Sequence, residues 1–193
     1  MKRASTYVRI PRERIGVLIG PNGRIKESVE KKFNVELHID SDAGSVKITL
    51  NSDDQDPFSL FRTREVVTAI GRGFSPERAF KLLEDEETML QIIDLREIIG
   101  RSPSDIKRLK GRIIGKNGRT RGIIEELTAA EISIYGYTVS IIGNMDQINV
   151  AKEAILMLLK GKQHRTVYQY LYNKRRELKK KDMELWETKT PTF

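Results

Sequence analysis

Two short glycine loops are the parts of this chain best suited to chemistry with a phosphate backbone. The first, GPNG, covers Gly20 to Gly23, and the second, GKNG, covers Gly115 to Gly118. Because glycine has no Cβ, the backbone of such a loop can approach a sugar–phosphate chain closely, and the amides at the start of a following helix can point toward phosphates. A single GxxG is weak evidence, since the same pattern also makes a tight structural turn.

The basic side chains gather around both loops. Residues 1–32 carry nine Lys or Arg against three Asp or Glu, and residues 101–127 carry eight against three. Residues 33–100 hold seven basic against fourteen acidic side chains, and residues 161–193 are basic again, with nine against four. A net charge of +8 distributed in this way predicts that a polyanion binds at two sites.

The composition argues against several other classes of protein. With no cysteine in the chain, disulfides, cysteine nucleophiles and thiolate metal sites are excluded. No apolar run reaches the length of a membrane span, and the N-terminus lacks the features of a signal peptide, so we expect a cytoplasmic protein. A nuclease or nucleotide hydrolase is the enzyme alternative, but the chain has no GxxxxGK[ST] loop and only two histidines, His38 and His164. The DDQD segment, 53–56, is better explained by helix capping than by a metal site. We therefore expect no catalytic residues, no metal and no cofactor.

The loops belong to a longer internal repeat. The matching residues are Gly16, Gly20, Asn22, Gly23, Arg24 and Glu30 in the first copy, and Gly111, Gly115, Asn117, Gly118, Arg119 and Glu125 in the second. VELHI at 35–39 corresponds to AEISI at 130–134, and SVKIT at 45–49 corresponds to TVSII at 138–142. A repeat of this length indicates a duplicated module rather than a solenoid of short repeats.

Hydrophobic spacing and capping residues predict the elements of each copy. In the first copy we expect a strand at 6–10, helices at 12–19 and 24–33, strands at 35–39 and 45–50, and a helix at 57–72. In the second copy we expect a strand at 89–95, a helix capped by Ser102 and Pro103, a helix after the loop, the strands at 130–134 and 138–142, and a helix at 145–159. Ser75 and Pro76 predict a helix between the copies, and a final helix begins near His164. The order is β-α-α-β-β-α, twice.

This order, with a glycine loop between the first two helices, resembles the KH RNA-binding domain of the first topological type. The resemblance implies an α+β fold with two tandem type I KH domains, each an antiparallel three-stranded sheet with helices on one face. The expected divisions are a first KH domain at 1–73, a linker helix at 74–87, a second KH domain at 88–160, and a basic C-terminal helix and tail at 161–193.

In KH domains the loop clamps about four nucleotides, whose bases lie in an adjacent apolar groove. The resemblance therefore implies two sets of RNA-binding residues. The first set is Gly16, Ile19, Gly20, Pro21, Asn22, Gly23, Arg24, Ile25, Lys26, Leu37, His38 and Ile39. The second set is Gly111, Arg112, Ile114, Gly115, Lys116, Asn117, Gly118, Arg119, Thr120, Arg121, Ile132, Ser133 and Ile134.

The two loops differ at their second position. Pro21 removes one amide donor and stands where many KH domains carry a cation, although Arg24 and Lys26 follow closely. The second loop has Lys116 at this position and Arg119 just after it. We therefore expect the second loop to contribute more of the affinity for phosphate.

Three further segments carry a closer resemblance. Residues 69–83, 109–128 and 166–171 look like the archaeal branch of the partner-of-Nob family of pre-ribosomal KH proteins, also called Dim or Krr-like. That family implies binding near the 3′ end of small-subunit ribosomal RNA. It also implies the Nob endonuclease, the rRNA dimethylase and the alpha subunit of initiation factor two as partners.

Two other functions stay open at this point. A general KH protein of mRNA or translation would show no preference for the rRNA 3′ end. A scaffold would use the acidic residues 84–87 and the tyrosines of 168–172 for protein partners. The basic segment 173–182 fits either an added RNA contact or a solvated helix face.

Overall fold

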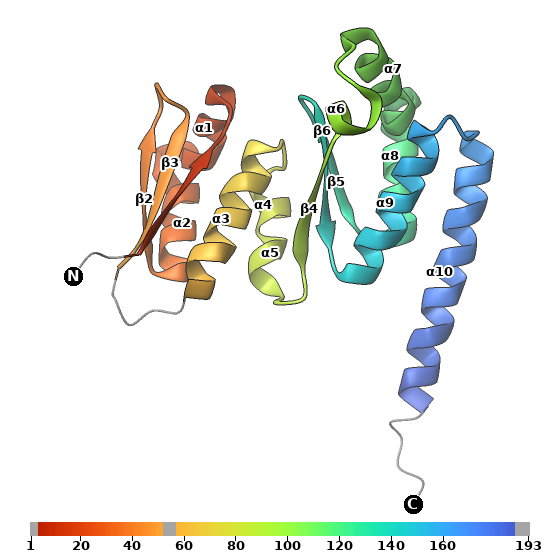
Figure 1. Cartoon of the computed structure of the whole chain (residues 1–193). Coiled ribbons are helices and arrows are strands. Elements are labelled where there is room, and N and C mark those ends of the chain that lie inside the picture. Colours follow the sequence, from red (N-terminus) through yellow and green to blue (C-terminus); the bar gives the residue numbers. More distant parts are fainter. Residues whose placement is uncertain (1–3, 52–56, 188–193) are drawn as a thin grey trace, which may run out of the picture. The chain divides into compact units, whose positions relative to one another are not determined.

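The computed structural model of this chain describes residues 4–51 and 57–187, with side chains described up to residue 180. The DDQD segment and the last side chains of the basic segment 173–182 therefore lie outside the described residues. Contacts divide the chain into two units, whose elements are labelled in Figure 1. The first unit takes in the chain up to Ile93 together with Ile132–Ile142, and the second takes in Asp94–Glu131 together with the chain from Gly143 onward.

The first unit holds the first copy of the repeat in the expected order. Its elements are β1 (Ser5–Arg9), α1 (Arg12–Ile19), the single turn η1 (Pro21–Gly23), α2 (Arg24–Phe33), β2 (Val35–Asp40), β3 (Ser45–Leu50) and α3 (Pro57–Gly71). The strands form an antiparallel sheet in the order β1-β3-β2, with Val8 opposite Val46 and Leu37 opposite Ile48. This sheet and its helices confirm the α+β fold that the sequence predicts.

Strand alternation explains why one face of this sheet is buried. Val46, Ile48 and Leu50 of β3 are almost fully buried, whereas Tyr7 of β1 points to the opposite face and is exposed. The turn between β2 and β3 closes when the Asp40 carboxylate accepts the amides of Asp42 and Ala43. α1, α2 and α3 lie on one side of this sheet (Figure 1), and the glycine loop connects α1 to α2.

A second three-stranded sheet is formed by β4 (Met89–Asp94), β6 (Thr138–Gly143) and β5 (Glu131–Tyr135), in that order. Most of it belongs to the first unit, and Ile142 joins the hydrophobic core there. The Ser133 hydroxyl donates to the carbonyl of Arg72 at 2.8 Å, just beyond α3. The Tyr135 hydroxyl donates to Glu13 of α1 at 2.5 Å, and this hydrogen bond lowers the pKa of the Glu13 carboxyl. The second sheet is therefore attached to the helices of the first copy.

The second unit holds the helices of the second copy. They are α6 (Leu95–Ile99), α7 (Pro103–Ile114), the single turn η2 (Lys116–Gly118), α8 (Arg119–Thr128), α9 (Met145–Leu159) and α10 (His164–Glu187). Ser102 caps α7 as expected, because its hydroxyl accepts the amide of Asp105. Asn144 and Gln147 form a capping box at the start of α9. Among the helices that the structure describes, none combines the length and the apolar character needed to cross a membrane.

The structure departs from the predicted elements in two places. The strand expected at 89–95 ends at Asp94, whose carboxylate accepts the amide of Arg96 and begins the unpredicted helix α6. The linker helix expected at 74–87 is two short helices, α4 (Pro76–Ala79) and α5 (Lys81–Glu84), which meet at Phe80. Phe74, Ala79 and Leu82 are almost fully buried, so packing into the core decides the path of this segment.

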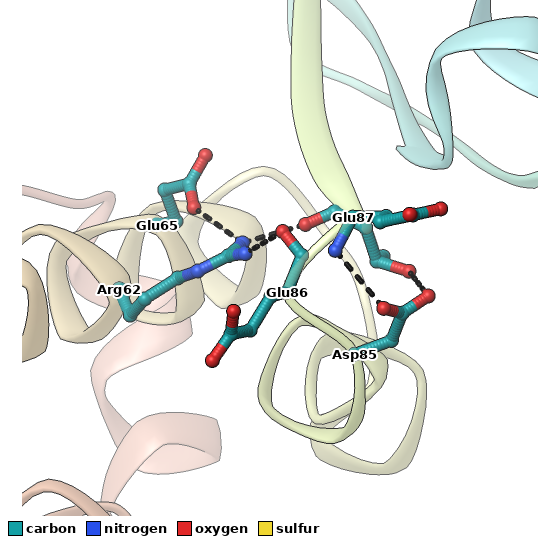
Figure 2. A network of polar contacts seen from close by, with 6 residues as sticks. Arg62, Glu65, Asp85, Glu86 and Glu87 are labelled. Carbon is teal, nitrogen blue, oxygen red and sulfur yellow. Dashed lines mark hydrogen bonds and ion pairs between the residues drawn. The ribbon is translucent and has the colours of Figure 1, made fainter.

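A buried arginine fastens the acidic linker to α3. Figure 2 shows the Arg62 guanidinium donating to the Glu65 carboxylate at 3.2 Å and to the carbonyl of Glu86; it also donates to the carbonyl of Thr88 at 2.6 Å. Burial raises the pKa of Glu65, and the nearby Arg62 charge opposes that rise. The Asp85 carboxylate accepts the amide of Glu87, so this stretch forms its own turn. The backbone of the acidic stretch is thus part of the packed structure.

We expect Arg62→Met to lower the free energy of unfolding by about 3 kcal/mol, because the carbonyls of Glu86 and Thr88 lose their donor and Glu65 loses its counter-charge. Urea denaturation monitored by circular dichroism measures this loss. Arg64→Met, an exposed position of the same helix, is the matched control and should change the free energy by less than about 0.5 kcal/mol. Equal denaturation midpoints for the two variants would contradict the structural role of Arg62.

Candidate nucleic-acid interface

Both glycine loops have the same backbone conformation. The first glycine has φ 70° and ψ 176° at Gly20, and φ 73° and ψ 174° at Gly115. Asn22 and Asn117 follow with φ 53° in the left-handed region, as do the final glycines of the two loops. A conserved shape across two copies with different second residues means that the loop geometry does not depend on Pro21.

The first glycine of each loop is required by space as well as by its dihedral angles. A Cβ on Gly20 would lie 2.3 Å from Ile25 Cγ1, and a Cβ on Gly115 would lie 2.2 Å from Thr120 Oγ1. The last glycine differs, because a Cβ on Gly118 would meet no atom within 4 Å. The first glycine therefore lets the loop close over the next helix, and the last one leaves open surface where a phosphate can approach.

The loops are closed by their own hydrogen bonds. The amide of Gly23 donates to the carbonyl of Gly20, and the amide of Gly118 donates to that of Gly115, each at 3.2 Å. The helices α2 and α8 begin at the next residue, so their positive N-terminal ends face the loops. Pro21 has no backbone N–H, which leaves the first loop with one donor fewer than the second.

In the first copy the predicted residues fall into two groups. Pro21, Asn22, Arg24 and His38 are exposed, and Gly16 also lies at the surface; Ile19, Ile25, Lys26 and Ile39 are half-buried. The Lys26 ammonium lies 3.7 Å from Glu30, whose carboxylate also accepts the amide of Leu37 at 2.8 Å. The side chain of Leu37 is 1% exposed, so a nucleotide can meet only its backbone.

The second loop presents two exposed cations, Lys116 and Arg119. The Arg121 guanidinium lies 3.7 Å from Glu125, as Lys26 does from Glu30 in the first copy. Gly111 is exposed, Ile114 is half-buried, and Asn117 is exposed at the loop tip.

Two predicted residues of the second copy have structural partners that the sequence does not indicate. The Arg112 guanidinium donates to the carbonyls of Leu158 and Lys162, which fixes the turn between α9 and α10. The Thr120 side chain is 3% exposed, and its hydroxyl lies 3.0 Å from the Tyr168 hydroxyl of α10. Long-range contacts of this kind leave no periodic signal in the sequence, and only the fit of the second loop onto α10 reveals them.

The strand residues predicted for the second site lie on β5, within the first unit. Ile132 is fully buried and Ser133 is 7% exposed, whereas Ile134 is half-buried. The hydroxyl of Ser133 is engaged by Arg72. Their RNA-binding role stays a prediction, and of these three side chains only that of Ile134 is open to a nucleotide.

Comparison with known families finds a KH domain in each half of the chain. Residues 89–176 match the family described as eukaryotic type KH-domain (KH-domain type I), and residues 11–85 match the Krr1 KH1 domain.

Similar proteins come from archaea and eukaryotes. A KH domain-containing protein of Methanocaldococcus jannaschii is 44% identical over 183 residues, which are 95% of this chain and 79% of that protein. The pre-rRNA-processing protein PNO1 of Candida albicans is 24% identical over 168 residues, and this chain spans 61% of its length. Among solved structures, a chain in the crystal structure of an a/eIF2alpha–aDim2p–rRNA complex from Pyrococcus horikoshii superposes with a TM-score of 0.84. That chain is 47% identical, and the match covers 91% of this chain and 96% of that one.

We expect Gly115→Ala to destabilise the protein more than Gly118→Ala. The first change forces an atom against Thr120 at dihedral angles that suit only glycine, at a cost of about 2–3 kcal/mol. The second places alanine in the left-handed region with open space around it, at a cost of about 1 kcal/mol. Urea denaturation measures both, and Gly20→Ala against Gly23→Ala repeats the comparison in the first copy. Equal losses within a pair would contradict the spatial argument.

We expect removal of two charges at the second loop to weaken RNA binding more than removal of two at the first. Lys116→Gln with Arg119→Gln takes away exposed cations, whereas Arg24→Gln with Lys26→Gln takes away one exposed cation and one already beside Glu30. Titration of a single-stranded RNA at several salt concentrations measures the effect. The slope of log affinity against log salt concentration should fall in magnitude by about 1.4 for the Lys116/Arg119 variant and by less for the Arg24/Lys26 variant. Equal losses in the two double variants would overturn this ranking.

Proposed function

The chain belongs to the family of two-KH-domain proteins that includes PNO1 and the archaeal Dim2 proteins, and on this premise we propose that it binds single-stranded RNA through both glycine loops. We propose the 3′ end of small-subunit ribosomal RNA as its target during ribosome biogenesis. The observation that carries the proposal is the closely matching backbone conformation of Gly20–Gly23 and Gly115–Gly118, each followed by a helix N-terminus.

The electrostatics support a polyanionic ligand at these loops. Arg24 lies exposed at the start of α2, and Lys116 and Arg119 lie exposed on either side of the second loop tip. Backbone amides and cations give affinity for phosphates without selecting a sequence, so base selection falls to the groove beside each loop. We propose a binding function, not a catalytic one, for this chain.

The relatives support the choice of ribosomal RNA. The Candida protein is described as pre-rRNA-processing, and the Pyrococcus chain is described in a complex with rRNA and a/eIF2alpha. We propose the alpha subunit of initiation factor two as a protein partner on that basis. We propose the Nob endonuclease and the rRNA dimethylase as partners on the family resemblance alone. We propose a cytoplasmic location on the composition of the sequence.

Two alternatives make different predictions. A general mRNA-binding KH protein would bind RNAs of unrelated sequence equally well. A scaffold for processing enzymes would not need the loops, and the acidic stretch that it would use has its backbone held by Arg62.

The proposal is tested with short RNAs from the 3′ end of small-subunit rRNA and with scrambled RNAs of the same composition. We expect the wild-type protein to prefer the rRNA sequence. Lys116→Asp with Asn117→Asp, and Pro21→Asp with Asn22→Asp, should each weaken binding about tenfold or more, because new carboxylates repel phosphate. Fluorescence anisotropy measures affinity, and circular dichroism checks that each variant is folded.

The ribosomal target and the binding through the loops are tested by different results. Equal affinity for scrambled RNA would overturn the ribosomal target and favour the general RNA-binding alternative. Unchanged affinity in the folded variant carrying all four substitutions would overturn the loop-mediated mode.

A further inference from the structure

The helix α10 presents two different faces. Val167 and Leu171 are fully buried on its inner face. Tyr170, Lys174, Glu177 and Leu178 continue that face and line a hollow against α9, together with Asp146, Asn149 and Val150. The outer face of α10, on the opposite side, consists of Arg165, Tyr168, Gln169, Tyr172, Asn173 and Arg176, which together line a shallow hollow. These six residues recur at intervals of three and four, so they form one stripe along the helix.

The charge of the outer face is uniformly positive. The only acidic residue between 164 and 180 is Glu177, and it lies on the inner face, where the Lys174 ammonium pairs with it at 2.6 Å. The outer face carries Arg165 and Arg176 at its two ends, and Lys179 extends the same stripe. Nothing on this face between residues 164 and 180 repels an anion.

Two tyrosines and two amide side chains lie between these two arginines. Tyr172 lies at the centre of the stripe, and its side chain is 55% exposed. Gln169 and Asn173 flank it one turn or less away and are also exposed. An exposed ring between cations suits the stacking of an unpaired base, whereas an acidic peptide would have little use for an open ring. The chemistry of the stripe therefore favours single-stranded nucleic acid.

The stripe begins beside the second glycine loop. The hydroxyl of Tyr168, a residue of the stripe, lies 3.0 Å from the hydroxyl of Thr120. Thr120 directly follows the loop cation Arg119. The His164 ring packs at a tilt of 58° against the Tyr168 ring, with their centroids 6.2 Å apart, and its Nε2 lies 3.0 Å from the carbonyl of Arg112. A strand held at the loop thus has this face of α10 as the adjoining surface.

We propose that the outer face of α10 extends the second RNA site, so that the strand leaving the loop lies along this helix with a base stacked on Tyr172. Arg165 and Arg176 pair with phosphates, and Gln169 and Asn173 meet base edges. The stripe from Arg165 to Arg176 spans about 17 Å at 1.5 Å per residue, enough for roughly five stacked nucleotides. The inference rests on the proposed function of the second loop.

The test compares a short RNA of about five nucleotides, enough for the loop, with RNAs extended by about six nucleotides at the 5′ or the 3′ end. We expect one extension to raise the affinity of the full wild-type chain about tenfold. Tyr172→Ala should abolish this gain and leave binding of the short RNA unchanged, whereas Tyr172→Phe should keep the gain, because a ring remains for stacking. Arg165→Gln with Arg176→Gln should reduce the gain and its salt dependence.

Matched controls separate this effect from general losses. Tyr7→Ala removes another exposed ring, from β1, and Lys31→Gln with Lys32→Gln removes two charges from the C-terminal end of α2. Both controls should leave the gain from extension intact.

The outcomes distinguish the extension from the loop function itself. If the short RNA binds and depends on Lys116, but neither extension adds affinity, the role of α10 is overturned and the loop function stands. If the gain survives Tyr172→Ala, or if an acidic peptide displaces the extended RNA from α10 without displacing the short one, the stripe is not a stacking surface for RNA. If the wild type binds neither RNA, the proposed function itself fails.

Discussion

The side chain of the second residue of α2 or α8 lies directly beneath the first glycine of the preceding loop. Ile25 and Thr120 approach so closely that even a methyl group on Gly20 or Gly115 would overlap them. This contact turns the chain sharply between two helices and brings both a helix N-terminus and a loop tip to one place. The exposure of the residues at each loop tip depends on this contact, because the chain makes its sharp turn where the first glycine packs against the helix.

Around this constraint the two copies have diverged. In the first, the apolar Ile25 packs against the core of its own unit. In the second, Thr120 supplies a hydroxyl, and that hydroxyl meets Tyr168 of a helix that the first copy lacks. At this position the first copy thus packs against its own core, while the second copy contacts α10.

The repeat, its elements and the glycine loops could be predicted from the sequence, because they depend on local spacing. α1, α3 and α7 begin at or next to Pro, α2 and α8 follow Gly, and β3 alternates strictly. Other features could not be predicted, because they depend on contacts between distant residues. The sequence predicts Arg112 as a cation of the loop, whereas its guanidinium donates to the carbonyls of Leu158 and Lys162 just before α10. The burial of Ser133 against the end of α3 is a further case, since a polar residue in a strand gives no hint of a partner 61 positions earlier.

The attachment of the second sheet to the first unit has a consequence for how the chain folds and evolves. Chain order suggests two modules that could be separated at the linker. Ile142 nevertheless packs into the core of the first copy, and Ser133 donates to Arg72, which precedes the linker. A first module made alone would leave part of its apolar surface uncovered and its α3 terminus without the hydroxyl of Ser133. The two copies of the repeat therefore depend on each other for packing. A fragment that contains only one copy should unfold less cooperatively than the intact chain.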